Sequence, residues 1–180
     1  MIDIMLANGF EEIEAVTTYD ILRRCGLQVA FVSVVNTKKV VGAHKVSIMA
    51  DDIFQRDMTK DCEAIILPGG MPGADNLLHH EGLRKMLTQQ DKEEKLIAAI
   101  CAAPMVLGHC GLLAGRKATC YPGFESYLRN AIKVEGTVVK DGHIITSQGP
   151  ATVTDFAFEI ARYFVSDDIV RQVRESMLYD

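Results

Sequence analysis

Short apolar runs alternate along this chain with longer amphipathic stretches. Runs rich in Val, Ile and Leu predict buried strands, and stretches with apolar residues three or four positions apart predict helices. The predicted strands are Ile2–Leu6, Gln28–Val35, Ala64–Leu67, Leu96–Ile100, Lys117–Cys120, Thr137–Lys140 and Ile144–Ser147, with a short hairpin in Val40–Met49. The predicted helices are Glu11–Cys25, Gly82–Glu94, Pro104–Cys110, Gly123–Asn130, Thr152–Val165 and Asp167–Tyr179.

Glycines mark two of the boundaries. Gly26 follows the first predicted helix as a stop signal, and Asp141-Gly142 joins the last two strands as a tight hairpin. Apolar strands that alternate with helices imply an α/β fold, doubly wound, with a mostly parallel sheet covered on both faces. Sites in such folds lie at the carboxyl ends of the strands. This rule selects three loops, Ala7–Glu14, Pro68–Asn76 and Cys101–Pro104.

Composition narrows the class of protein. The 180 residues suit one domain, 1–180, and 48% hydrophobic and 24% charged residues are ordinary for a globular protein. A net charge of −5 without any basic run argues against binding to nucleic acid. No apolar stretch is long enough to span a membrane, and the N-terminus lacks the pattern of a signal peptide. We therefore expect a cytoplasmic protein.

The cysteines fit a reducing compartment. They are odd in number and form no C-x-x-C pair, so we expect free thiols and no structural metal site. They are Cys25, Cys62, Cys101, Cys110 and Cys120.

Cys101 stands where a predicted strand meets a predicted helix, in the sequence AAICAAP. Such a corner strains its central residue and needs small neighbours, which Ala99 and Ala103 supply, while Pro104 suits a first helical turn. Backbone N–H groups and the helix dipole favour a thiolate, so we expect a pKa below the ordinary value of about 8.5. The corner thus predicts a nucleophile. The alternative is that Cys101 is a small, inert core residue.

The other two loops supply further candidates. In LPGGMPGADNL, Gly69 and Gly70 could aim backbone amides at a carbonyl attacked by Cys101, or could simply form a tight turn. In GFEEIEA, Glu14 lies on an apolar helical stripe, which predicts a buried carboxyl with a raised pKa or one that reaches past the stripe to solvent. A protonated Glu14 could donate a hydrogen bond to a Cys101 thiolate or act as general acid or base.

The remaining polar residues near these loops give weaker signals. Glu11 and Glu12 are expected to be solvated, and His44 in the hairpin segment is expected to lie away from the selected edge. The other histidines, His79, His80, His109 and His143, form no evident pair with Cys101. The stretch CYPGFE brings Cys120, Tyr121 and Glu125 toward the same edge.

Five stretches, GFEEIEA, LPGGMPGADNL, AAICAAP, KDGHIITSQGPAT and DFAFEIARYF, together resemble the DJ-1/ThiJ/PfpI superfamily, in order over nearly the whole chain. The likeness is strongest to its DJ-1/ThiJ branch and implies a flavodoxin-like fold with a small β-hairpin, in a single domain that forms homodimers. By position, Cys101 matches the family's oxidation-sensitive elbow cysteine and Glu14 the protonated glutamate beside it. Gly69 and Gly70 match the glycine turn whose amides face the cysteine.

The resemblance implies a cysteine-dependent glyoxalase or deglycase that acts on small α-oxoaldehydes such as methylglyoxal, or on their adducts. The resemblance also implies that this reaction uses no metal or other cofactor. Cys101 and Glu14 would be catalytic, and the amides of Gly69, Gly70 and Ala102 would hold the oxyanion. The alternatives it implies are an oxidative-stress sensor or redox-regulated chaperone that works through oxidation of Cys101, and a role in thiamine biosynthesis.

Two positions depart from relatives. Tyr121 stands where some relatives have a histidine, so it is at most an accessory residue, and turnover should be weaker or depend on Glu14 alone. Ala102 stands where the PfpI branch has a histidine, which argues against protease activity.

Overall fold

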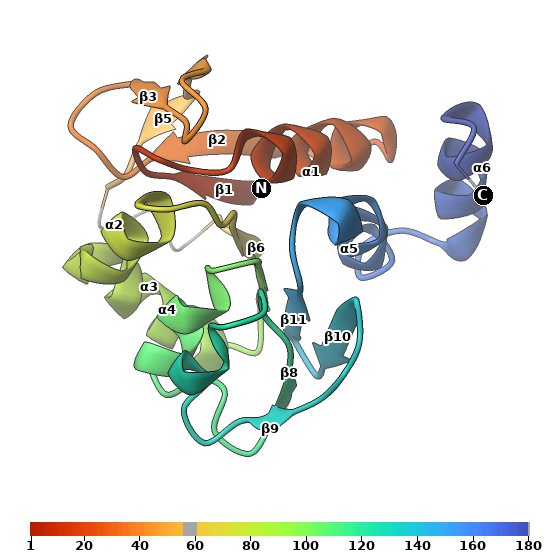
Figure 1. The fold of residues 1–180 in the computed structure, drawn as a ribbon. Coiled ribbons are helices and arrows are strands. Elements are labelled where there is room, and N and C mark those ends of the chain that lie inside the picture. Colours follow the sequence, from red (N-terminus) through yellow and green to blue (C-terminus); the bar gives the residue numbers. More distant parts are fainter. Residues whose placement is uncertain (56–60, 180) are drawn as a thin grey trace.

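A seven-stranded sheet forms the centre of the computed structural model, which describes residues 1–55 and 61–179 (Figure 1). The strand order is β10-β11-β7-β6-β1-β2-β5, and every neighbouring pair is parallel except β10 with β11. The mostly parallel α/β sheet predicted from the sequence is therefore confirmed. Its strands are β1 (Ile2–Leu6), β2 (Val29–Ser33), β5 (Asp52–Ile53), β6 (Ala64–Leu67), β7 (Leu96–Ile100), β10 (Val138–Asp141) and β11 (Ile144–Ser147).

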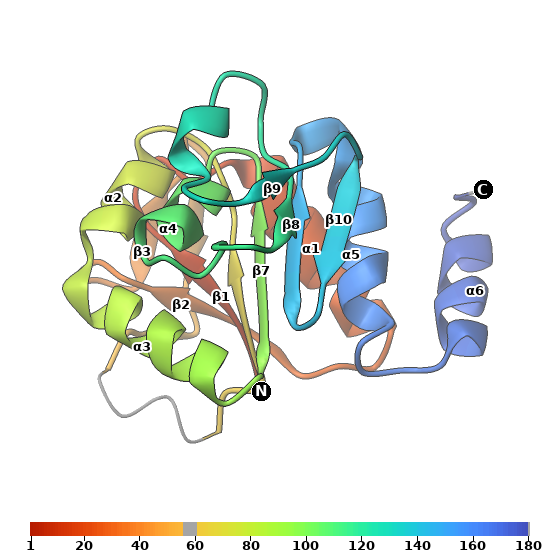
Figure 2. The same cartoon turned by 90° about the horizontal axis from the view of Figure 1, so that it is seen from below.

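The three central strands, β1, β6 and β7, are buried at every position. Fully apolar strands of this kind need a helical layer on each side. Helices α1 and α5 pack together on one face, whereas α2, α3 and α4 cover the other (Figure 2). The helices are α1 (Glu12–Arg24), α2 (Gly73–His79), α3 (Glu81–Lys92), α4 (Pro104–His109), α5 (Val153–Ala161) and α6 (Asp167–Ser176).

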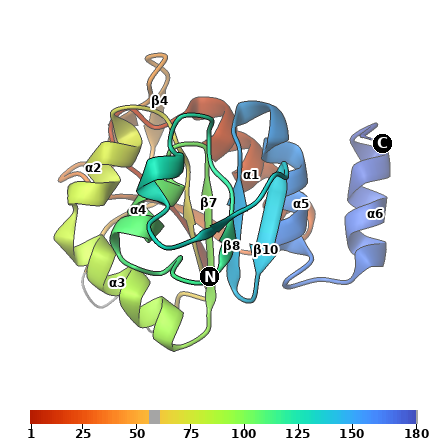
Figure 3. The same cartoon turned by 60° about the horizontal axis from the view of Figure 1, so that its bottom comes forward.

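Helix α6 stands at the outer side of α5, at the end of the chain (Figure 3). The Arg174 guanidinium lies 5.1 Å from the centre of the Phe158 ring on α5. No helix in the described ranges is long and apolar enough to cross a membrane.

Two small antiparallel features follow the sequence prediction. Asp141-Gly142 closes the β10–β11 hairpin, and the hairpin predicted over Val40–Met49 is formed by β3 (Lys39–Val41) paired with β4 (Ser47–Met49). The β3–β4 hairpin lies beside the start of α1, because the Ala43 N–H donates to the Phe10 carbonyl at 2.8 Å.

The segment after α4 differs from the prediction. The predicted helix over Gly123–Asn130 is wrong: only a 3-10 turn, η2 (Glu125–Tyr127), forms there. Gly123 and Asn130 have φ angles of +96° and +57°, which a right-handed helix does not allow. The predicted strand over Lys117–Cys120 reduces to β8 (Lys117–Ala118), which pairs with β9 (Ile132–Lys133) outside the main sheet. A second 3-10 turn, η3 (Pro150–Thr152), leads into α5.

The strand order places the three selected loops together. Strand β6 lies between β1 and β7, so the loops that follow these strands meet at one edge of the sheet. The Glu11 N–H donates to the Gly69 carbonyl at 2.9 Å, and the Gly73 N–H donates to the Gly9 carbonyl at 3.1 Å.

Candidate functional site

Cys101 occupies the corner between β7 and α4. Its φ of +63° places it in the left-handed region, which a non-glycine residue adopts only under strain. Ala99 and Ala103, the small residues expected on either side of such a corner, are fully buried. The Cys101 N–H donates to the Ser147 carbonyl, and its carbonyl accepts from the Tyr121 N–H, both at 2.9 Å. The strained elbow predicted from the sequence is thus present.

Glu14 approaches Cys101 from the first turn of α1. Its side chain is 1% exposed, and its Oε2 accepts the Gly69 N–H at 2.7 Å. Within the described part of the chain, its Oε1 has no hydrogen-bond partner. Gly69 fills the space between the two residues: a Cβ there would lie 2.6 Å from the Cys101 Cβ and 2.9 Å from Glu14 Oε2. Position 69 therefore requires a glycine, because no side chain fits between Cys101 and Glu14.

Burial sets the protonation of this pair. It raises the pKa of Glu14 to about 7, against the hydrogen bonds from Gly69 and Cys101, which lower it. Burial is also the main cause that raises the pKa of Cys101 to about 12, and the Glu14 charge adds to it. The expected fall in the Cys101 pKa is therefore wrong. The amides do favour the thiolate, but burial and the neighbouring carboxylate outweigh them.

The consequence is a division of roles. The raised pKa of Cys101 keeps the proton on Sγ near neutral pH, and Glu14 is the group of the two that ionises first. Glu14 is thus placed to accept the thiol proton when Cys101 forms a bond.

The predicted backbone amides separate into two sets. The N–H groups of Gly70 and Ala102 interact with the Cys101 sulfur and favour its charged form. The Gly69 N–H instead holds Glu14. The structure therefore places two amides, and not three, at the reactive atom.

The CYPGFE segment lies next to the elbow without entering it. The Tyr121 side chain is 46% exposed and lines a shallow hollow of about 170 Å³ with Gln148 and Gly149. The Glu125 carboxylate accepts the Gly123 N–H and so stabilises its own turn. Cys120 is buried and lines a separate hollow of about 200 Å³.

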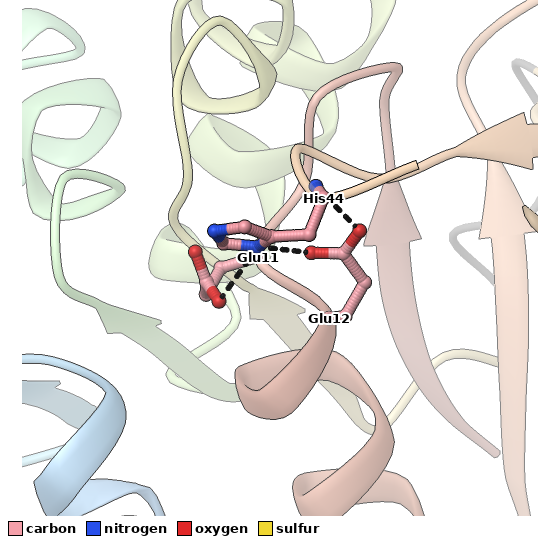
Figure 4. Close-up of side chains that lie close together, drawn as sticks. All are labelled: Glu11, Glu12 and His44. Atoms are coloured by element: carbon pink, nitrogen blue, oxygen red, sulfur yellow. Dashed lines mark hydrogen bonds and ion pairs between the residues drawn. The ribbon is translucent and has the colours of Figure 1, made fainter. Parts of the chain in front are cut away.

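The sequence prediction missed a contact at the start of α1. Glu11 and Glu12 were expected to be solvated and His44 to lie away from the edge, but the β3–β4 turn brings His44 onto both carboxylates (Figure 4). The side chains of Glu11 and Glu12 are only 17% and 13% exposed. One side-chain oxygen or nitrogen from each of Glu11, Glu12 and His44 lies within 4.8 Å of the others, a spacing that can suit a metal ion. Here, however, hydrogen bonds from His44 and Val46 already occupy Glu12.

Comparison with known proteins agrees with this geometry. The family model described as "DJ-1/PfpI family" matches residues 1–163. The chain belongs to the DJ-1/PfpI family. The crystal structure of Drosophila melanogaster DJ-1beta superposes with a TM-score of 0.95 at 34% identity, over 99% of this chain and 97% of that one. The fold and the family expected from the sequence are thereby shown.

Three curated relatives carry informative names. Protein DJ-1 homolog B of Arabidopsis thaliana is 40% identical over 92% of this chain, which spans only 38% of that protein. Deglycase PH1704 of Pyrococcus horikoshii is 32% identical over 82% of this chain and 89% of its own. Glutathione-independent glyoxalase DJR-1.2 of Caenorhabditis elegans is 36% identical over 83% of this chain and 80% of its own.

Proposed function

We propose that this protein is a cysteine-dependent enzyme that converts small α-oxoaldehydes such as methylglyoxal, or their thiol and amine adducts, to 2-hydroxy acids without a cofactor. The observation that carries the proposal is the buried pair of Cys101 and Glu14, in which Gly69 leaves room for the two side chains to interact. The names of two relatives, a deglycase and a glutathione-independent glyoxalase, support the same chemistry.

The first step is addition of Cys101 to the aldehyde. The sulfur forms a bond to the aldehyde carbon, the carbonyl electron pair moves to oxygen, and Glu14 transfers the thiol proton to that oxygen. The Gly70 and Ala102 amides, which face the sulfur, would hold the developing oxyanion. The product is a hemithioacetal.

The next steps isomerise and release the adduct. The Glu14 carboxylate takes the proton from the former aldehyde carbon and passes it to the ketone oxygen, which gives an enediol. It then takes the proton of the hydroxyl on the sulfur-bearing carbon and delivers it to the neighbouring carbon. A thioester results. Water hydrolyses it to lactate and frees the thiol, so the sum is methylglyoxal plus water to lactate. A base with a pKa of about 7 suits both directions of this transfer.

The test is lactate formation from methylglyoxal by the wild type, Cys101→Ala and Cys110→Ala. Cys110 is a half-buried thiol on a different surface, beside Arg84, and serves as the matched control. We expect activity to vanish in Cys101→Ala and to persist in Cys110→Ala. Equal lactate formation by the wild type and Cys101→Ala would refute the mechanism.

A second function is favoured by one observation. Tyr121 supplies no imidazole for proton transfer, whereas the amides at Cys101 could equally hold the oxygens of an oxidised sulfur. In this alternative, peroxide oxidises the thiol to a sulfenic acid and then a sulfinic acid, with release of one water at each step. Mass spectrometry after mild peroxide treatment should then find oxygen on Cys101 before the other cysteines, and even oxidation of all of them would exclude a sensor.

We also propose a homodimer. Ile13 and Val16 on α1 are 48% and 45% exposed, on the helix that carries Glu14. Exposed apolar residues side by side on one helix favour a protein partner, and a second copy is the simplest one. Light scattering coupled to gel filtration should give a dimer for the wild type and a monomer for the double variant Ile13→Asp with Val16→Asp.

A further inference from the structure

His44 reaches the start of α1 from a turn more than thirty residues away in sequence. It lies between β3 and β4, and its N–H donates to Glu12 Oε1 at 2.7 Å. Its ring Nδ1 lies 2.9 Å from Glu12 Oε2 and 3.5 Å from Glu11 Oε1, so both carboxylates flank one imidazole (Figure 4). The His44 side chain itself is 69% exposed and can exchange protons with solvent.

Glu11 connects this group to the reactive pair. Its backbone N–H donates to the Gly69 carbonyl at 2.9 Å, and the Gly69 N–H in turn holds Glu14. A Cβ on Gly70 would lie 2.4 Å from the Glu11 nitrogen, so the glycine turn rests directly on Glu11. One short path of contacts therefore joins His44, Glu11, the glycine turn and Glu14.

We propose that His44 is a positioning residue of the Cys101 site, which acts through Glu11: its imidazole, when protonated, offsets the charge of the Glu11 carboxylate and so keeps Glu14 available to take the thiol proton. The inference rests on the proposed function, in which Glu14 is the base. It adds a further element, the β3–β4 turn, to a site otherwise built from the loops after β1, β6 and β7.

The sign of the effect follows from the charges that face each group. Besides burial and the bonds from Gly69 and Cys101, Glu14 faces the Glu11 charge, which raises its pKa. Burial raises the pKa of Glu11, the facing His44 lowers it, and the neighbouring Glu12 raises it. The hydrogen bond to Glu12, and next the Glu11 charge, raise the pKa of His44. Loss of the imidazolium therefore leaves Glu11 unopposed and makes Glu14 harder to ionise.

The experiment measures Glu14 directly, in the intact protein. The infrared carbonyl stretch of its protonated carboxyl, assigned by its disappearance in Glu14→Gln, is titrated with pH in the wild type and in His44→Ala. We expect the midpoint to rise by about half a pH unit in His44→Ala. A shift of this size is typical of one charge that acts over several ångströms in a partly solvated environment. His44→Arg, which keeps a positive charge, should restore the wild-type midpoint.

Two controls separate charge from structure. His79→Ala removes another exposed histidine, which lies 3.5 Å from the Asp75 carboxylate on α2, and should leave the midpoint unchanged. In a Glu11→Gln background, His44→Ala should cause no further shift. An unmoved midpoint in His44→Ala, or a shift that persists without the Glu11 charge, would overturn the inference.

Activity is a separate readout. With methylglyoxal as the probe, the acid limb of kcat/KM should move with the infrared midpoint. A midpoint shift in a protein without lactate formation would refute the proposed function and leave the role of His44 in the ionisation of Glu14 intact.

Discussion

Glu14 is the residue on which the chemistry depends, since it is a buried base held at one oxygen by Gly69. Glu14→Gln keeps the shape and can still accept the Gly69 N–H, but it cannot take up a proton. We expect the fold to be retained and kcat/KM to fall by about 100-fold to 10,000-fold, the range of general acid–base catalysis. Circular dichroism and the lactate assay check the two parts, and wild-type turnover in Glu14→Gln would exclude Glu14 as the base.

Glu14→Asp separates position from charge. The shorter side chain withdraws the carboxyl from the sulfur, so the reactivity of Cys101 toward iodoacetamide should change although the charge remains. If the pH dependence of alkylation stays the same in both Glu14→Asp and Glu14→Leu, Glu14 does not belong to the site.

Thr18 lies one turn further along α1 and is the other residue with an unpartnered buried side-chain oxygen in the described ranges. Thr18→Val removes that hydroxyl at almost constant volume. We expect a gain in the free energy of unfolding of about 1 kcal/mol, because an unsatisfied buried hydroxyl is destabilising. Urea unfolding measures the gain, with Thr17→Val at a half-buried neighbouring position as the control. A loss of stability specific to Thr18→Val would show that the hydroxyl has a bonding partner.

At the scale of elements, the elbow works because β7, the glycine turn and α1 approach closely. Gly69→Ala would place a Cβ 2.6 Å from the Cys101 Cβ, 2.9 Å from Glu14 Oε2 and 3.0 Å from the Ile100 carbonyl. Because the Ile100 backbone cannot move easily, the added Cβ should push Glu14 and Cys101 apart. We therefore expect kcat/KM to fall by at least about 100-fold.

Gly142→Ala is the matched control for this prediction. Gly142 has a φ of +61° in the β10–β11 turn, and a Cβ there meets nothing within 4 Å. Its substitution should reduce stability by about 1 kcal/mol through backbone strain alone and leave kcat/KM unchanged. Equal activity in the two variants would contradict the close packing at Gly69.

The sequence allowed the meeting of Cys101 with Glu14 to be predicted, since strand-end loops converge and an acid on an apolar stripe is conspicuous. The Asp141-Gly142 hairpin could also be predicted, because its turn type requires those residues. Helix α2 could not be predicted, since GADNLLH begins with a glycine and is too short to show a clear helical period. The contact of His44 with Glu12 spans 32 residues and depends on how the β3–β4 hairpin packs, which no local pattern reports.

For the whole molecule, buried acids couple stability to pH. Burial raises the folded-state pKa of Glu14 to about 7, and it also raises the pKa of Asp3, at the start of β1. A carboxyl whose pKa is higher in the folded state binds its proton more tightly there than in the unfolded chain. The stability that this proton contributes is present below the unfolded pKa and is lost as pH rises through the folded value.

Glu14→Gln should therefore be stabilising only at the higher pH values. Its free energy of unfolding should equal that of the wild type near pH 4, and exceed it by about 3 kcal/mol above pH 7, as a shift from 4.5 to about 7 requires. Urea midpoints for both proteins across this range measure the difference. A difference that stays constant with pH would mean that Glu14 titrates alike in the folded and unfolded chain, and the site would then lack the buried base that its proposed chemistry requires.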